Sequence, residues 1–134
     1  MIKKFIICIV IIAILGVVVY MIYFRNIINT DFATSAIIRL PDNNLIVITD
    51  EDEIRELQGI LRGRAVADSP ASGFSINVSI TMASEDQEIV FLPALTGSSI
   101  VRIHNLDKYI VITDQQREFI DMLFERNGLR FPYI

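Results

Sequence analysis

The chain has 134 residues, of which 52% are hydrophobic and 21% charged, and this length predicts a single domain. Its mean hydropathy of +0.48 is too high for an ordinary soluble domain, and most of the excess lies in the first 24 residues. From Asn26 onward the chain carries 9 basic and 16 acidic residues. This excess of acidic residues is unlike a nucleic-acid-binding domain, which carries a basic surface. It would suit a basic partner protein, and it is also ordinary for a soluble domain. Composition therefore excludes a purely soluble protein and a nucleic-acid-binding domain.

Residues 1–25 are predicted to form a transmembrane helix that anchors the chain in membrane lipid. Residues 5–24 read FIICIVIIAILGVVVYMIYF, without a charge in 20 positions. At about 1.5 Å per residue such a helix is about 30 Å long, the thickness of a bilayer core. Lys3 and Lys4 precede this run and only Arg25 follows it closely. The positive-inside rule therefore predicts a cytoplasmic N-terminus and a C-terminal domain outside the cell membrane.

A cleaved signal peptide is the alternative for this segment, because it also combines a basic start with an apolar stretch. Signal peptides usually have a shorter stretch and end at small residues, whereas this one ends at Tyr20-Met21-Ile22-Tyr23-Phe24. An uncleaved anchor is therefore favoured. Cys8, the only cysteine, lies within the run, so no intramolecular disulfide is available to the exported domain.

Residues 26–35 are short and polar and are predicted to be a linker, followed by a domain over 36–134. The runs 36–40 and 45–48 flank a turn cluster, which predicts a hairpin. A helix then begins at Thr49-Asp50, with Thr49 and Asp52, or Asp50 and Glu53, at capping-box spacing. Gly63 is expected to end it in the left-handed conformation. Its apolar stripe consists of Ile54, Leu57, Ile60 and Leu61.

The second half of the domain is predicted to contain four strands and a helix. Residues 74–82 alternate strictly between apolar and small polar side chains, which is typical of a half-buried strand. Shorter strands follow at 88–92, 100–103 and 109–112. Thr113-Asp114 then begins a last helix, with Gln116 at the capping-box position. Its core stripe consists of Phe119, Ile120 and Leu123.

The predicted order β-β-α-β-β-β-β-α indicates an α+β, two-layer domain. Short connections favour a mainly antiparallel sheet, with both helices on one face. The sequence Ile46-Val47-Ile48-Thr49-Asp50 recurs as residues 110–114, and a strand with an arginine, Arg39 or Arg102, precedes each copy. The recurrence is consistent with two related hairpin–helix units. It is equally consistent with one favourable local solution used twice.

Chemical motifs are sparse. The acidic run 50–53 lacks the ligand spacing of a calcium loop and is better explained as a helix N-terminus. His104 is the only histidine, and without a cysteine in the domain no His/Cys zinc cluster is available. A hydrolase would need Ser98 or Ser99 within hydrogen-bond reach of His104. The sequence therefore predicts no catalytic residue, no cofactor and no metal.

Two features are candidate partner-binding surfaces. One is the neutral face of the strand 74–82, which could accept a partner strand if it lay at a sheet edge. The other is the C-terminal tail, which either packs onto the domain or docks on a partner. The candidate residues are Ser75, Asn77, Ser79, Thr81, Phe131 and Tyr133.

These observations lead to a functional hypothesis. We expect a non-enzymatic, membrane-anchored module that binds an envelope or secreted protein outside the cytoplasm. The alternative is an inhibitor or immunity-type protein whose acidic domain covers the basic cleft of a toxin or cell-wall enzyme. A small envelope hydrolase using Ser98 or Ser99 with His104 is the third hypothesis.

Overall fold

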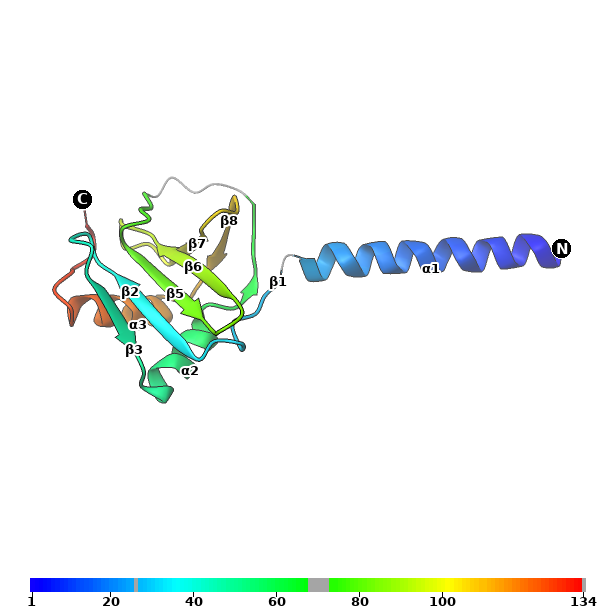
Figure 1. The fold of residues 1–134 in the computed structure, drawn as a ribbon. Helices are drawn as coiled ribbons and strands as arrows, with labels where there is room; N and C mark the ends of the chain where they lie inside the picture. The colour runs from blue at the N-terminus through cyan, green and yellow to red at the C-terminus, as the bar shows by residue number, and fades with distance from the viewer. Residues whose placement is uncertain (26, 68–72, 134) are drawn as a thin grey trace.

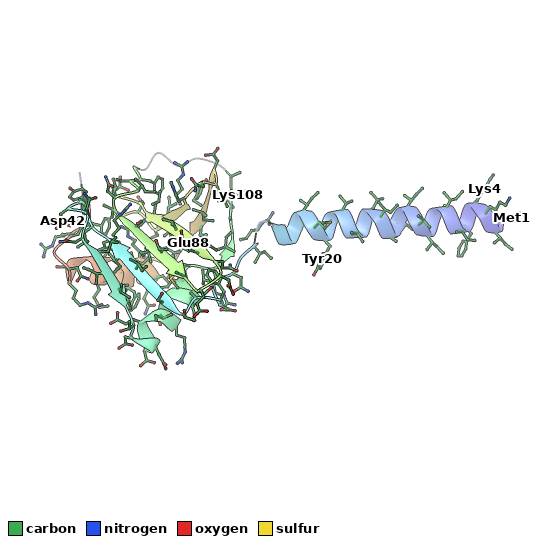
Figure 2. All side chains as sticks on the ribbon, in the orientation of Figure 1. Met1, Lys4, Tyr20, Asp42, Glu88 and Lys108 are labelled. Atoms are coloured by element: carbon green, nitrogen blue, oxygen red, sulfur yellow. The ribbon has the colours of Figure 1, made fainter. Side chains whose placement is uncertain are left out.

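The computed structural model describes residues 1–25, 27–67 and 73–133. It consists of a long N-terminal helix, α1 (Ile2–Arg25), and an α+β domain (Figure 1). Side chains of α1 are exposed from Ile2 to Ile22, and Figure 2 shows Lys4 and Tyr20 projecting sideways from the helix. Within the described ranges, α1 is the one helix that is long and apolar enough to cross a membrane.

Six strands form one antiparallel sheet. They are β2 (Ser35–Arg39), β3 (Leu45–Ile48), β5 (Ser79–Ala83), β6 (Glu88–Pro93), β7 (Ile100–Ile103) and β8 (Lys108–Val111). Their order across the sheet is β3-β2-β5-β6-β7-β8, and all neighbours run antiparallel. Short hairpins make most of these connections, as the sequence predicts. The edges of the sheet are therefore β3 and β8.

Helices α2 (Glu51–Ile60) and α3 (Asp114–Glu125) pack on one face of this sheet and enclose the core. Asp50 caps α2 by accepting hydrogen bonds from the backbone N–H groups of Asp52 and Glu53. Thr113 and Gln116 form a complete capping box at α3. Side chains that are less than 2% exposed lie where both layers meet and include Ile38, Leu57, Ile80, Phe91, Val101, Ile120 and Phe124.

The two hairpin–helix units occupy equivalent places in the sheet. Strands β5 and β6 form the centre, β2 and β7 flank them, and β3 and β8 lie at the edges. Arg39 lies opposite Leu45 in the first hairpin, and Arg102 lies opposite Tyr109 in the second. Each edge strand then leads into a helix of the core face. The recurring sequence 46–50 and 110–114 therefore corresponds to two positions related by a pseudo-twofold axis through the centre of the sheet.

Of the segment predicted to be a linker, 26–35, Asn26 lies outside the described residues, and residues 27–35 contribute structure to the domain. Strand β1 (Ile27–Ile28) pairs antiparallel with β4 (Gly63–Arg64) in a two-stranded ribbon that the sequence patterns do not predict. The side chain of Thr30 is fully buried and donates a hydrogen bond to the carbonyl of Gln58 at 3.0 Å. Such a ribbon cannot be predicted from the sequence, because strands of two residues show no periodic pattern. Buried polar residues such as Thr30 also resemble the polar residues of a linker.

Two predicted boundaries differ from the structure. The strand predicted over 74–82 begins at Ser79, because Val78 donates a backbone hydrogen bond to the carbonyl of Ser75 and closes a turn. Helix α2 ends at Ile60, with Leu61 as its C-cap, so Gly63 does not end it. Gly63 does adopt a positive φ of 117°, but it does so within β4.

Candidate interaction surface

The sheet face opposite the helices carries apolar side chains along the edge strands. Side chains alternate between the two faces of each strand, so Leu45 and Val47 lie on this outer face while Ile48 enters the core. Leu45 is 58% exposed and Val47 is 57% exposed. The equivalent edge residue Val111 of β8 is 67% exposed. Both edges of the sheet therefore present large apolar groups to solvent.

The backbone of β3 is hydrogen-bonded on one side. The N–H of Leu40 donates to the carbonyl of Asn44 at 3.0 Å, which sets the alternation of the β2–β3 ladder. By that alternation Ile46 and Ile48 direct their backbone groups toward β2, whereas Leu45 and Val47 direct theirs outward. No residue in the described ranges pairs with these outward groups. We call the outward backbone groups and exposed side chains of Leu45 and Val47 the β3 edge.

The opposite edge of the sheet is covered at one residue, Tyr109. Val66 and Tyr109 exchange two backbone hydrogen bonds, of 2.9 Å and 3.0 Å, across the outer side of β8. Tyr109 is the residue equivalent to Leu45 in the pseudo-twofold arrangement. Natural proteins usually blunt a sheet edge with lysine, proline, a bulge or a covering segment. Strand β3 has the sequence Leu-Ile-Val-Ile, so it contains neither lysine nor proline.

Acidic residues lie at both ends of the β3 edge. Asp42 lies in the preceding turn, where its carboxylate accepts hydrogen bonds from the backbone and side chain of Asn44. Asp50 and Glu51 follow β3 after Thr49, at the N-terminus of α2. Among the described residues, the ion pairs that form do not include Asp42, Asp50 or Glu51. Figure 2 places Asp42 at the end of the domain remote from α1.

Glu53, one turn into α2, is neutralised by a different element. Arg126 donates hydrogen bonds to both of its carboxylate oxygens, at 2.9 Å and 2.8 Å. This hydrogen bonding to Arg126 lowers the pKa of Glu53 below its usual value, against an opposing effect of burial. The pair joins the first turn of α2 to the residue that follows α3. The acidic run 50–53 is therefore divided between capping, ion pairing and solvent.

The predicted neutral strand face does not form as one surface. Ser75 and Asn77 lie in the turn before β5, where the Ser75 hydroxyl accepts the Asn77 N–H at 3.2 Å. Ser79 is only 3% exposed, and Thr81 is half-buried between Ile37 of β2 and Val90 of β6. Strand β5 is paired on both sides, so it is a central strand and not an edge. Whether these four residues contact a partner stays a prediction.

The C-terminal tail packs onto the domain. Phe131 is half-buried, with its ring centroid 5.3 Å from that of Phe124 in an edge-to-face arrangement. The guanidinium of Arg117 lies 4.4 Å from the centroid of Phe131. Tyr133 donates its backbone N–H to the carbonyl of Leu95 at 2.8 Å, while its side chain is 39% exposed. Of the two predicted tail residues, Tyr133 is thus the more accessible.

Arg117 connects helix α3 to the segment between β6 and β7. Its side chain is 3% exposed and donates to the carbonyls of Ser98 and Ala94 and to the carboxylate of Asp121, at 2.8–3.0 Å. Burial lowers the pKa of Arg117, and the nearby charge of Asp121 opposes this effect. The sequence does not single out this residue, because an arginine on a helix usually lies in solvent.

The residues of the hydrolase hypothesis lie apart. Ser99 precedes β7 and donates its hydroxyl to Asp114 at 2.6 Å, and the Ser98 hydroxyl is bonded to that of Thr96. His104 follows the other end of β7, beside Val90. Ser99 and His104 are five positions apart along extended chain, which corresponds to roughly 16 Å between their Cα atoms. The structure does not bring Ser98 or Ser99 to this histidine.

The β3 edge was missed because its sequence signal is ambiguous. Four consecutive apolar residues suggest a strand buried on both faces more readily than an edge strand. The absence of lysine and proline from β3 would have been the informative observation. Comparison of the chain with protein-family models, with curated proteins and with solved structures finds no match.

Proposed function

We propose that this chain is a single-pass, membrane-anchored and non-enzymatic module that binds an envelope or secreted protein through the β3 edge. The observation that carries this proposal is the β3 edge itself, which offers backbone hydrogen-bonding groups beside the exposed side chains of Leu45 and Val47. A strand edge of this kind recognises an extended partner segment through main-chain hydrogen bonds and side-chain contacts. The tether is α1, whose length and apolarity suit a bilayer.

The distribution of charge supports an extracytoplasmic domain. Lys3 and Lys4 precede the apolar run, and this bias favours a cytoplasmic N-terminus. The separation of Ser98 and Ser99 from His104 supports a binding function over hydrolysis. The position of Asp42 at the end remote from α1 indicates that the β2–β3 hairpin points away from the anchor (Figure 2).

Reporter fusions test the orientation. Alkaline phosphatase and green fluorescent protein are fused in turn after Ile134, and fragment size is followed by blotting. Phosphatase activity at full length in the membrane fraction is the expected result. Fluorescence without phosphatase activity contradicts the orientation, and activity on a shortened, soluble fragment contradicts the anchor.

Photo-crosslinking tests the binding surface. A benzophenone amino acid replaces Val47 on the β3 edge or, as the matched control, Met122 on α3, which is 45% exposed. In intact cells we expect a discrete adduct with another envelope or secreted protein from position 47 and not from position 122. Equal labelling from both positions, or none from position 47, would contradict binding through the β3 edge.

A further inference from the structure

We infer that the β3 edge binds an extended partner segment that alternates apolar residues and carries lysine or arginine at both ends. This inference rests on the proposed function and specifies the chemistry of the partner. Three observations carry it: the backbone bridge to Tyr109 at the equivalent edge, the exposed apolar groups of Leu45 and Val47, and the acidic residues at both ends of β3.

The covered edge shows how an added segment is held. At β8, Val66 meets the outward backbone of Tyr109 with an N–H···O bond in each direction, at 2.9 Å and 3.0 Å. Leu45 occupies the equivalent position at β3 and turns the same backbone groups outward. An extended segment placed antiparallel to β3 would form equivalent bonds with Leu45 and Val47.

Side chains beside the β3 edge define the pattern of the segment. Leu45 and Val47 are more than half exposed on the outer face, and Ile46 is half-buried on the other. A partner residue directly opposite Leu45 or Val47 would extend their apolar row, because cross-strand neighbours on one face lie about 5 Å apart. Apolar residues at alternate positions of the partner satisfy this requirement.

Charge decides between a second copy of this chain and a different partner. If β3 paired antiparallel with itself around Ile46, Asp42 of each copy would lie opposite Asp50 of the other, with Glu51 nearby. Like charges placed opposite one another destabilise paired strands. A segment with lysine or arginine at both ends would instead meet Asp42 at one end and Asp50 and Glu51 at the other. The geometry therefore favours a basic partner over self-association.

Two synthetic peptides test this inference on the full chain held in lipid nanodiscs. One is Lys-Lys-Thr-Val-Thr-Val-Thr-Lys-Lys, and the other replaces each lysine by glutamate. We expect the lysine peptide to bind at least about tenfold more tightly than the glutamate peptide, and its affinity to fall as salt is raised. Equal affinities, or no binding of the lysine peptide, would overturn the proposed partner chemistry.

Matched proline variants locate the binding. Val47→Pro removes an outward N–H of β3 without removing a bond to β2, and Val111→Pro makes the equivalent change at β8. The first is expected to abolish binding of the lysine peptide, and the second to leave it unchanged. Unfolding curves of both variants verify that they are folded. Retained binding by a folded Val47→Pro variant would contradict binding at the β3 edge.

A charge variant tests the role of the flanking acids. Asp42→Asn with Asp50→Asn retains the cap of α2, because asparagine also caps helices, and removes two charges. Each substitution is expected to lower the affinity for the lysine peptide by about two- to fivefold. An unchanged affinity would contradict the proposed contribution of Asp42 and Asp50 to binding of a basic segment.

The crosslinking experiment at Val47 distinguishes a failure of the proposed function from a failure of the proposed partner chemistry. A heterologous adduct at that position without peptide preference sustains the proposed function and overturns the partner chemistry. An adduct between two copies of the chain overturns both the basic partner and the argument against self-association. The absence of any adduct contradicts the proposed function itself.

Discussion

Leu45 and Tyr109 hold equivalent positions at the two edges of one sheet, yet within the described ranges only Tyr109 has a backbone partner there, Val66. Each residue lies opposite an arginine of the neighbouring strand, Arg39 or Arg102. The hairpin turns of the two units each contain an asparagine in the left-handed region, Asn43 at φ 67° and Asn105 at φ 69°. The pseudo-twofold arrangement is therefore broken at the edge, where β8 is covered at Tyr109 and β3 is not covered at Leu45.

Replacing Arg117 is expected to cause a large loss of stability. Arg117→Ala leaves the carbonyls of Ser98 and Ala94 and the carboxylate of Asp121 without this donor, and the Ala94 carbonyl is buried. A loss of about 3 kcal/mol in the free energy of unfolding is expected, since breaking a buried charged network costs this much. Urea unfolding of the full chain in detergent measures it.

Arg55 provides the control for Arg117. Its side chain is 75% exposed, and its ion pair with Asp52 is 3.7 Å long. Arg55→Ala is expected to change the free energy of unfolding by less than about 0.5 kcal/mol. Equal effects of the two substitutions would contradict the structural role of Arg117.

Phe131 should contribute to stability through the packed tail. Phe131→Ala removes the ring that contacts Arg117 and Phe124, and a loss of about 2 kcal/mol is expected because the side chain is only half-buried. Tyr133→Ala, which retains the backbone bond to Leu95, should cost less than about 1 kcal/mol. Carboxypeptidase digestion followed by mass spectrometry provides an independent measurement. A tail that is cut equally fast in both variants and in the parent would show that it does not pack.

The ion pair between Glu53 and Arg126 predicts a pH dependence. Because the pKa of Glu53 is lowered in the folded state, its contribution is fully present above the unfolded value of about 4.3. The contribution is lost as pH falls through the lower, folded pKa. Arg126 is half exposed, so solvent screening limits the effect to about 0.5–1 kcal/mol.

Thermal melts of Glu53→Gln and the parent between pH 3 and pH 7 measure this contribution. The two proteins should differ most near neutral pH and converge in acid. Glu125→Gln is the control, since the Glu125–Arg130 pair is 56% and 80% exposed. A difference between Glu53→Gln and the parent that grows as pH falls would have the wrong sign.

The cap of α2 distinguishes two neighbouring residues. Sequence spacing allows either Thr49 or Asp50 to begin the capping box, and in the structure the Asp50 carboxylate accepts the N–H groups of Asp52 and Glu53. Asp50→Ala should therefore cost about 1 kcal/mol, and Thr49→Ala less than about 0.5 kcal/mol, in urea unfolding. The reverse order would place the cap one residue earlier.

Much of the fold could be predicted from local sequence patterns. The hairpin before α2 and the capping box Thr113–Gln116 are confirmed. The predicted stripe of α2 is buried as expected, although its last residue, Leu61, is the C-cap. Each is determined by residues within one or two turns of one another. The antiparallel order of the sheet follows from short connections between the strands.

The remainder depends on contacts that are distant in sequence. The alternation over 74–82 could not distinguish a strand from a turn followed by a strand, because Ser75 bonds its own backbone two residues on. The ribbon of Ile28 with Gly63 joins residues 35 positions apart. The β3 edge is defined by the absence of a covering segment from the described ranges, which the sequence of β3 alone does not reveal.

Amide hydrogen exchange tests the central claim most directly, because it reports the backbone bonds of the β3 edge themselves. In the full chain in detergent, the N–H groups of Leu45 and Val47 are predicted to exchange quickly, while that of Tyr109 is protected by its bond to Val66. Adding the lysine peptide should protect Leu45 and Val47 and leave Tyr109 unchanged. Protection of Leu45 and Val47 before the peptide is added, or no change after it, would contradict the account.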